Sequence, residues 1–177
     1  QKYKDLNFFV TEKVDYQSVT FFLRKMKSGM FNKLVFGVCS RNLWLKREDN
    51  SLYWEIARKY NIEKILRDHY KRTGQELTIQ GEQGNQSVQK NKYGIKEPQM
   101  WIFNIVENRS NTHFGLKEML NFCEQNSLPF VPVLDKNFKL LPTVSEMVEY
   151  SKGYSMMNPS VKREGVVIRH ISGGQKI

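Results

Sequence analysis

The stretch Thr11–Ser18 constrains the fold most, because it places two opposite charges between two apolar segments. Residues 8–10 precede it as an expected strand, and a second strand is expected over 18–23. Lys13 and Asp15 therefore fall between two strands, where a rigid scaffold holds side chains for chemistry. A lysine in such a place becomes a nucleophile once its ammonium group loses a proton. An ordinary charged turn is the alternative interpretation.

Short apolar runs alternate with amphipathic segments along the rest of the chain. Strands dominate this pattern and helices are inserted between them, so an antiparallel α+β domain is expected rather than a parallel α/β one. Thr143 and Glu146 have capping-box spacing, which predicts a helix from there to about Lys152. The other expected strands are 34–39, 77–79, 101–106 and 164–169, and the other expected helices are 52–60 and 62–66 (or one helix broken near Asn61) and 116–123. The expected connections are a basic turn at 24–29, a polar loop at 83–87, an extended edge segment at 128–135 and a loop at 153–159.

Length and composition suit one domain with a real core, since the chain has 177 residues of which 40% are hydrophobic. No run of 18 apolar residues indicates a transmembrane helix, and the polar first residues do not resemble a signal peptide. The chain begins without Met, so a fragment is expected. Cys39 and Cys123 are interpreted as reduced thiols of an intracellular protein, cytoplasmic or nuclear. The three histidines show no metal-ligand spacing.

The net charge of +10, from 28 basic and 18 acidic residues, favours a polyanionic partner. Phosphates neutralised by Lys and Arg release counterions, which drives such binding. The charge does not separate RNA from DNA, or either of them from ATP.

Further motifs follow Lys13-x-Asp15 in a fixed order. They are Val-Cys-Ser-Arg-Asn-Leu at 38–43, Gln-Gly-Glu at 80–82, Gln-Lys-Asn-Lys-Tyr at 89–93, Trp-Ile-Phe-Asn-Ile-Val at 101–106 and Glu-Gly-Val-Val-Ile-Arg at 164–169. Together they resemble the RNA ligase 2-like family of ATP-dependent polynucleotide ligases, within the lysine nucleotidyltransferase superfamily. The resemblance implies an antiparallel-sheet, ATP-grasp-like ligase adenylation domain with inserted helices. It also implies ATP and Mg²⁺ (or Mn²⁺) as cofactors, RNA with nicked or broken ends as partner, a monomer, no membrane, and a role in RNA repair.

The resemblance assigns roles to particular residues. Lys13 is the expected nucleophile, which attacks the α-phosphorus of ATP and later passes AMP to an RNA 5′-phosphate, whose end is then sealed to a 3′-hydroxyl. The expected metal-binding carboxylates are Asp15, Glu82 and Glu164. The expected nucleotide-binding residues are Glu12, Lys13, Ser18, Arg41, Glu82, Phe103 and Glu164, with Phe103 stacking on adenine. Lys90, Lys92 and Arg169 are expected to contact RNA or phosphate.

The sequence departs from the family pattern in two places. Tyr16 stands where the family usually has Gly, a residue that lets a ligand approach the backbone closely. The family's last motif, a strand whose lysines contact the α-phosphate, is not matched, because Lys176 lies before the expected place. The expected domain is therefore an adenylyltransferase domain over residues 1–177, cut before that motif. Such a chain is expected to bind ATP but to adenylate Lys13 poorly.

Two alternatives remain open from the sequence. A DNA ligase or an mRNA-capping guanylyltransferase would share the lysine chemistry, although the motifs at 40–42 and 89–93 favour an RNA ligase. A non-catalytic nucleic-acid-binding domain would explain Tyr16 and the unmatched last motif.

Overall fold

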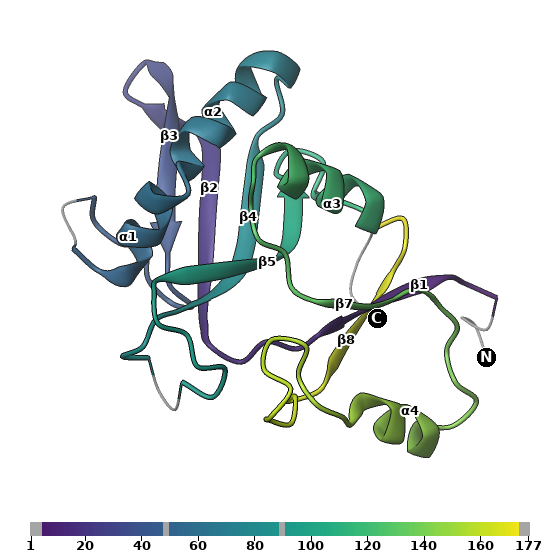
Figure 1. Ribbon diagram of the computed structural model, residues 1–177. Coiled ribbons are helices and arrows are strands. Elements are labelled where there is room, and N and C mark those ends of the chain that lie inside the picture. Colours follow the sequence, from purple (N-terminus) through teal and green to yellow (C-terminus); the bar gives the residue numbers. More distant parts are fainter. Residues whose placement is uncertain (1–4, 48–49, 89–90, 174–177) are drawn as a thin grey trace.

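The computed structural model describes residues 5–47, 50–88 and 91–173, which form two antiparallel sheets and associated helices (Figure 1). The larger sheet has the strand order β3-β2-β4-β5-β6, and the smaller has the order β7-β1-β8. The strands are β1 (Phe8–Glu12), β2 (Gln17–Ser28), β3 (Phe31–Cys39), β4 (Leu77–Gly84), β5 (Gln99–Glu107), β6 (Thr112–His113), β7 (Val133–Phe138) and β8 (Val166–His170). The helices are α1 (Leu52–Lys59), α2 (Ile62–Thr73), α3 (Leu116–Gln125) and α4 (Val144–Ser151). The expected antiparallel α+β fold is confirmed.

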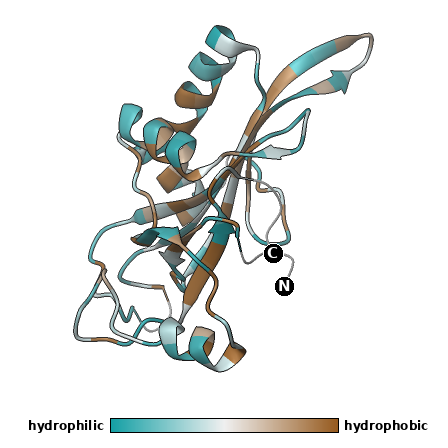
Figure 2. Cartoon of the chain, turned by 90° about the vertical axis from the view of Figure 1, so that its right-hand side faces the viewer, coloured by the Kyte–Doolittle hydropathy of each residue, from teal (hydrophilic) through white to brown (hydrophobic). Residues whose placement is uncertain are grey.

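The main core lies between the larger sheet and α1, α2 and α3. Fully buried side chains from the strands, such as Phe21, Ile79 and Ile105, meet Leu66 of α2 and Met119 of α3. Figure 2 shows hydrophilic and hydrophobic residues alternating along the helices, as expected when one helix face packs on a sheet. Burying a large apolar side chain contributes about 1.5–3 kcal/mol, so this face holds the helices against the sheet.

The break between α1 and α2 is at Asn61, whose φ of 52° is left-handed. Asn adopts that conformation more readily than most residues, because its short polar side chain can hydrogen-bond locally. Two separate helices are therefore present, which was one of the two expected forms. The capping box at the start of α4 is also confirmed: the Thr143 side chain accepts from the Glu146 backbone, and the Glu146 side chain accepts from the Thr143 backbone.

A second core supports the smaller sheet. Phe8 and Val10 of β1 are fully buried and pack with Phe138 of β7. Met147 and Tyr150 of α4 cover this cluster from outside. These apolar contacts hold the smaller sheet together. They also fix the end of β1, from which the chain continues to β2.

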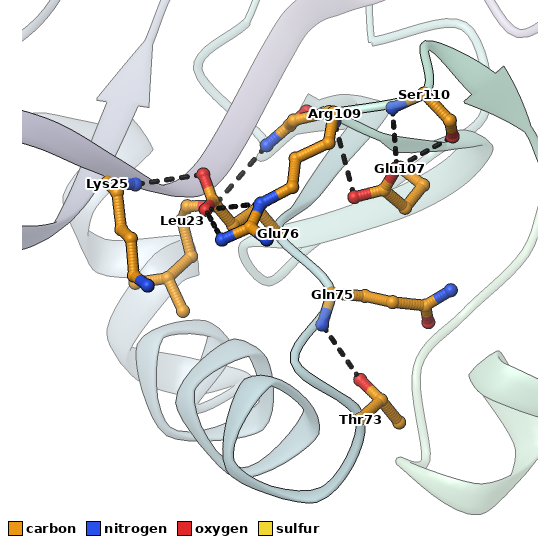
Figure 3. Close-up of polar contacts among 9 residues, drawn as sticks. Leu23, Lys25, Thr73, Gln75, Glu76, Glu107, Arg109 and Ser110 are labelled. Atoms are coloured by element: carbon orange, nitrogen blue, oxygen red, sulfur yellow. Dashed lines mark hydrogen bonds and ion pairs between the residues drawn. The ribbon is translucent and has the colours of Figure 1, made fainter.

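A buried polar network fixes the end of the larger sheet that lies away from Lys13 (Figure 3). Glu76, which is 6% exposed, accepts two hydrogen bonds from the Arg109 guanidinium, at 2.9 and 2.7 Å, and one from the Lys25 backbone at 2.9 Å. Glu107 accepts from the backbone and hydroxyl of Ser110 at 2.7 and 2.6 Å. These bonds tie β2, β4 and β5 together where buried carboxylates would otherwise be costly.

Two sequence interpretations were wrong at strand ends. The expected basic turn at 24–29 is strand as far as Ser28, because β2 continues as a hairpin with β3 beyond the core, and only Gly29 and Met30 turn. Residues 83 and 84, expected in a polar loop, belong to β4 and pair with β2 and β5. Among the described helices, none combines the length and the apolar character needed to cross a membrane.

Candidate active site

Lys13 lies on the segment that joins the two sheets. β1 ends at Glu12 in the smaller sheet, and β2 begins at Gln17 in the larger one. The Lys13 backbone donates to the Gly165 carbonyl at 3.0 Å, directly before β8. The Lys13 side chain is half exposed and forms an ion pair with Glu164. The pairing of β1 with β8 thus brings together two groups that are 151 residues apart in sequence.

Glu82 lies on β4 beside this pair, directly across from Ser18 of β2. Burial raises the pKa of Glu82 to about 7, against the lowering effects of the Tyr16 backbone, Lys13 and Arg41; Asp15 raises it further. The carboxyl group is therefore balanced between its neutral and ionised forms near neutral pH. A nearby cation would shift it toward the carboxylate.

Asp15 is exposed and faces the segment before β5. Its carboxylate is 3.5 Å from the Lys92 ammonium group, and its backbone donates to the Tyr93 hydroxyl at 3.4 Å. Burial alone would lower the pKa of Lys92. The interactions of its ammonium group with Tyr93 and Asp15 are together larger, so the pKa of Lys92 is raised. Lys92 is therefore a stable cation at the edge of the site.

The carboxylates fit a metal that is shared with a nucleotide better than one held by protein alone. In the described part of the chain, no three His, Cys, Asp or Glu side chains gather as a metal site. Mg²⁺ is usually held through one or two carboxylates together with substrate phosphates and water. Glu82, with Asp15 and Lys13 acting on it electrostatically, suits that arrangement.

Phe103 is half-buried in the middle of β5, and Arg169 of β8 packs against it. The Arg169 guanidinium lies 5.5 Å from the centre of the Phe103 ring and donates a hydrogen bond to the Phe103 carbonyl. Burial lowers the pKa of Arg169 to about 10, and its Nε atom has no hydrogen-bond partner among the described residues. Val14 belongs to the same apolar cluster, which connects the ring to the segment that carries Lys13.

Glu12 points away from the exposed side of the segment. Its side chain is 1% exposed, and it accepts a hydrogen bond from the Met156 backbone at 2.8 Å. Its own backbone donates to the Pro132 carbonyl at 2.9 Å. Glu12 therefore anchors the segment to the loops before β7 and β8.

The remaining expected site residues lie at different places. Ser18 is half-buried at the start of β2, and Arg41 is exposed in the turn after β3 but acts electrostatically on Glu82. Lys90 lies outside the described residues. The structure thus places Lys13, Glu164, Asp15 and Glu82 around one segment, with Phe103 attached through Val14. The functional roles of these residues stay predictions.

The hydrogen bond between the side chains of Tyr16 and Asn91 was not predicted from the sequence. The Tyr16 hydroxyl donates to the Asn91 side chain at 2.8 Å. The same Asn91 side chain bonds the backbone of Ile95 twice, at 2.7 and 2.8 Å. The segment 91–95 is therefore held against the segment after Lys13. The sequence signals only that Tyr16 differs from the family pattern.

The two antiparallel sheets, with a lysine paired to a glutamate at their junction, are the arrangement expected of a nucleotidyltransferase-type domain. A model of the RNA ligase family matches residues 6–176. The chain therefore belongs to the RNA ligase family. No curated protein sequence matches it.

Solved structures agree with this assignment. A Naegleria gruberi RNA ligase mutant with ATP and Mn superposes with a TM-score of 0.83 and 26% identity over 98% of this chain. A mutant of the same ligase with AMP and Mn gives 0.78 and 25% over 96%, and the ligase with PPi gives 0.81 and 25% over 98%. The matches cover 49%, 48% and 49% of those ligases, so this chain spans about half of their length.

Proposed function

We propose that residues 1–177 act as the adenylyltransferase domain of an ATP-dependent RNA ligase. The observation that carries the proposal is the contact of Lys13 with Glu164, with Glu82 beside it, at the junction of the two sheets. Membership of the RNA ligase family supports it, as do the ATP, AMP, PPi and Mn in the similar structures. The proposed partners are ATP and RNA with nicked or broken ends. We propose a monomer that works inside the cell, in the cytoplasm or the nucleus.

The proposed reaction has three steps. Lys13 Nζ, after losing a proton, attacks the α-phosphorus of ATP, forming a P–N bond as the bond to pyrophosphate breaks. An RNA 5′-phosphate oxygen then attacks the same phosphorus and releases the lysine. Finally, an RNA 3′-hydroxyl attacks the activated 5′-phosphate, and AMP leaves. Each step displaces one group at one phosphorus, so in-line positioning matters most.

The neighbours of Lys13 suit the first step. Glu164 restrains the lysine side chain, whose half-exposed ammonium group must exchange this partner for a nucleotide phosphate. Asp15, Glu82 and Glu164 are the proposed carboxylates for Mg²⁺ or Mn²⁺, with one or two of them binding the ion beside the nucleotide phosphates and the others acting through its waters. A bound divalent cation would neutralise phosphate charge and favour the ionised form of Glu82. Arg41 is proposed to contribute positive charge to the same region, because it already acts on Glu82.

The purine is proposed to lie against Phe103, with Ser18 beside it on the larger sheet and Glu12 contributing through the backbone that it anchors. Burial of Arg169 against the Phe103 ring favours a role in holding that ring over a direct contact with RNA. Lys92, a half-buried cation beside Asp15, remains the better candidate for phosphate contact.

The test is intact mass after incubation with ATP or GTP and Mn²⁺. The expected result is a gain of one AMP with ATP and no gain with GTP, followed by loss of the adduct when RNA with a 5′-phosphate is added. A GMP adduct would indicate a capping enzyme. Loss of the adduct only with nicked DNA would indicate a DNA ligase. No adduct with either nucleotide would contradict the proposal and favour a non-catalytic binding domain.

A further inference from the structure

A groove in the described part of the chain is lined by other residues than those around Lys13. It has a volume of about 640 Å³ and lies between β3, α1 and α2. A smaller cavity of about 290 Å³ continues it toward Trp44, and both are lined by Phe36, Arg47 and Trp54. We call the two together the α1–α2 groove. None of the residues assigned to nucleotide or metal binding lines it.

Among the described residues, the lining of the α1–α2 groove has more cations than carboxylates. Arg47 and Arg67 share the carboxylate of Glu63, with nitrogen–oxygen distances of 2.9 and 2.8 Å. Lys64 and Lys71 share the carboxylate of Asp68, at 2.5 and 3.8 Å. Four cations thus share two carboxylates, and each carboxylate can neutralise only one of them.

Arg58 adds a further cation to the same groove. It lies on the exposed side of α1 and forms no ion pair with any described residue. Arginine presents several donors in a planar fork that matches phosphate oxygens. The charges of the groove therefore suit a ligand with several phosphates rather than a neutral one.

Aromatic side chains form the other part of the groove. Trp44 is 53% exposed, and its ring meets Phe22 edge-on at 5.4 Å, which leaves indole surface open to a flat ligand. Trp54 forms part of the floor and is only 5% exposed. Its buried indole N–H has no hydrogen-bond acceptor among the described residues. A buried donor without an acceptor is costly, and because Trp54 lines the groove, a small shift of the neighbouring side chains would let a ligand oxygen accept this hydrogen bond.

We propose that the α1–α2 groove binds a segment of single-stranded RNA, at a site separate from Lys13. An exposed aromatic ring, here Trp44, beside a positively charged groove is a combination that binds single strands, because a base stacks on the ring while phosphates pair with cations. A duplex keeps its bases stacked inside and offers only phosphates to such a groove. An acidic peptide would use the cations, and its oxygens could accept from Trp54, but it would leave the exposed Trp44 ring without a flat group to stack on.

The loop after β3 gives this site a direct route to the nucleotide-binding region. Arg41, at its start, acts on Glu82, and Arg47, further along, lines the groove. Trp44 lies between them on the same loop. A strand held in the groove would therefore approach the Lys13 region along this loop. Binding in the groove does not require the proposed chemistry at Lys13, so the two proposals can fail independently.

The test measures the affinity of the chain for a fluorescent single-stranded RNA that lacks a 5′-phosphate and is not a ligation substrate. Arg58→Glu is expected to weaken binding at least tenfold and to flatten the dependence of affinity on salt, by about 0.7 in the log–log slope for each phosphate that is no longer neutralised. Lys117→Glu on the exposed side of α3 makes the same charge change outside the groove, and a change of less than about twofold is expected there.

Trp44→Ala provides a second variant that leaves every cation in place. Its side chain is largely exposed, so the fold should survive, and thermal unfolding checks this. Loss of one stacked base should weaken RNA binding about tenfold. Adenylation of Lys13 in both groove variants should match the unmodified chain, which separates this proposal from the proposed function.

Several outcomes would overturn the proposal. They are no measurable binding of the RNA, equal losses in Arg58→Glu and Lys117→Glu, and an unchanged affinity in Trp44→Ala. Tighter binding of duplex RNA, or of polyglutamate, would assign the groove to a different partner and would likewise reject the single-strand proposal.

Discussion

The ring of Tyr16 stacks on the indole of Trp101, with centroids 5.8 Å apart and planes 15° from parallel. Gly84 makes room for this stack, because a Cβ atom at that position would lie 3.0 Å from the Tyr16 ring. The Tyr16 hydroxyl also donates to Asn91. Tyr16, which stands where the family usually has glycine, thus holds the segment after Lys13 against β5. It makes rigid a segment whose backbone a glycine would leave more flexible.

This arrangement predicts graded effects of substitutions at Tyr16. Tyr16→Phe keeps the stack on Trp101 and loses the hydrogen bond to Asn91, so a loss of about 1 kcal/mol in unfolding free energy is expected. Tyr16→Gly removes both and should cost about 3 kcal/mol, despite restoring the usual family residue. Urea unfolding measures both changes. A Tyr16→Gly chain as stable as the unmodified one would show that the stack contributes nothing.

The adenylation rate should follow the same order. Tyr16→Phe is expected to stay within about threefold of the unmodified chain, because the ring still fixes the segment. Tyr16→Gly is expected to be at least tenfold slower at saturating ATP, since small misplacements of a reacting group are costly. Equal rates in all three chains would remove any positioning role for Tyr16.

Glu82 should make stability depend on pH. Its pKa is raised by burial from 4.5 to about 7 in the folded chain, so between these values the folded state binds more protons than the unfolded state. Unfolding free energy should therefore fall as pH rises from about 4.5 to about 7. The fall should be smaller than about 3.5 kcal/mol, the value for the full shift at about 1.4 kcal/mol per pKa unit, because Glu82 is only partly buried and solvent reduces the effect.

Glu82→Gln should remove this part of the pH dependence and raise stability above pH 7. Urea unfolding from pH 4 to pH 8 measures it. Glu149→Gln is the matched control, since Glu149 belongs to an exposed ion pair with Lys152 on α4 and its loss should change little. Parallel pH profiles for Glu82→Gln and the unmodified chain would refute the expected role of burial at Glu82.

Apolar patterning predicted the parts of the fold that the core stabilises, and missed the parts that backbone pairing supports. The apolar run at 34–39 lies within β3, and Phe36 and Val38 from it join the core that includes Trp54 of α1. The outer half of β2 escaped detection because Arg24, Lys25 and Lys27 project beyond the core. Their strand conformation comes from hydrogen bonds with β3, for example between the backbones around Lys25 and Leu34. Hydrophobic periodicity carries no trace of such pairing.

The site divides in a similar way. Lys13 was singled out by its place between two strands, and its link to Glu164 came from a family resemblance rather than from spacing. The contact itself depends on the register that places Glu12 opposite Val166. The pairing register of two strands whose residues are 151 positions apart in the sequence is set only when the sheet forms. Local sequence patterns do not reveal it. The inward packing of Arg169 on Phe103 was missed for the same reason.

The network around Glu76 should contribute measurably to stability. Glu76→Gln keeps the shape but weakens three hydrogen bonds, two of them with the Arg109 guanidinium, inside the sheet (Figure 3). Removing a buried charge partner typically costs about 1–3 kcal/mol. Lys64→Ala removes an exposed ion pair on α2 and should cost less than about 1 kcal/mol. Similar losses for the two variants would mean that burial of Glu76 adds nothing.

Lys13 allows the most direct test of the proposed chemistry. Lys13→Ala should abolish the AMP adduct while changing unfolding free energy by less than about 1 kcal/mol, because the side chain is half exposed and exposed ion pairs contribute little. Lys13→Arg keeps a positive charge that can still meet Glu164, but a guanidinium does not lose its proton in proteins. It should therefore also give no adduct. Lys92→Ala removes a different lysine at the edge of the site and should still be labelled, although more slowly. Intact mass and peptide mapping after incubation with ATP and Mn²⁺ distinguish these cases. An AMP adduct on the Lys13→Arg chain would show that another residue is the nucleophile. No adduct on Lys13→Arg, together with an adduct on Lys92→Ala, would show that Lys13 acts as the nucleophile and does not merely supply positive charge.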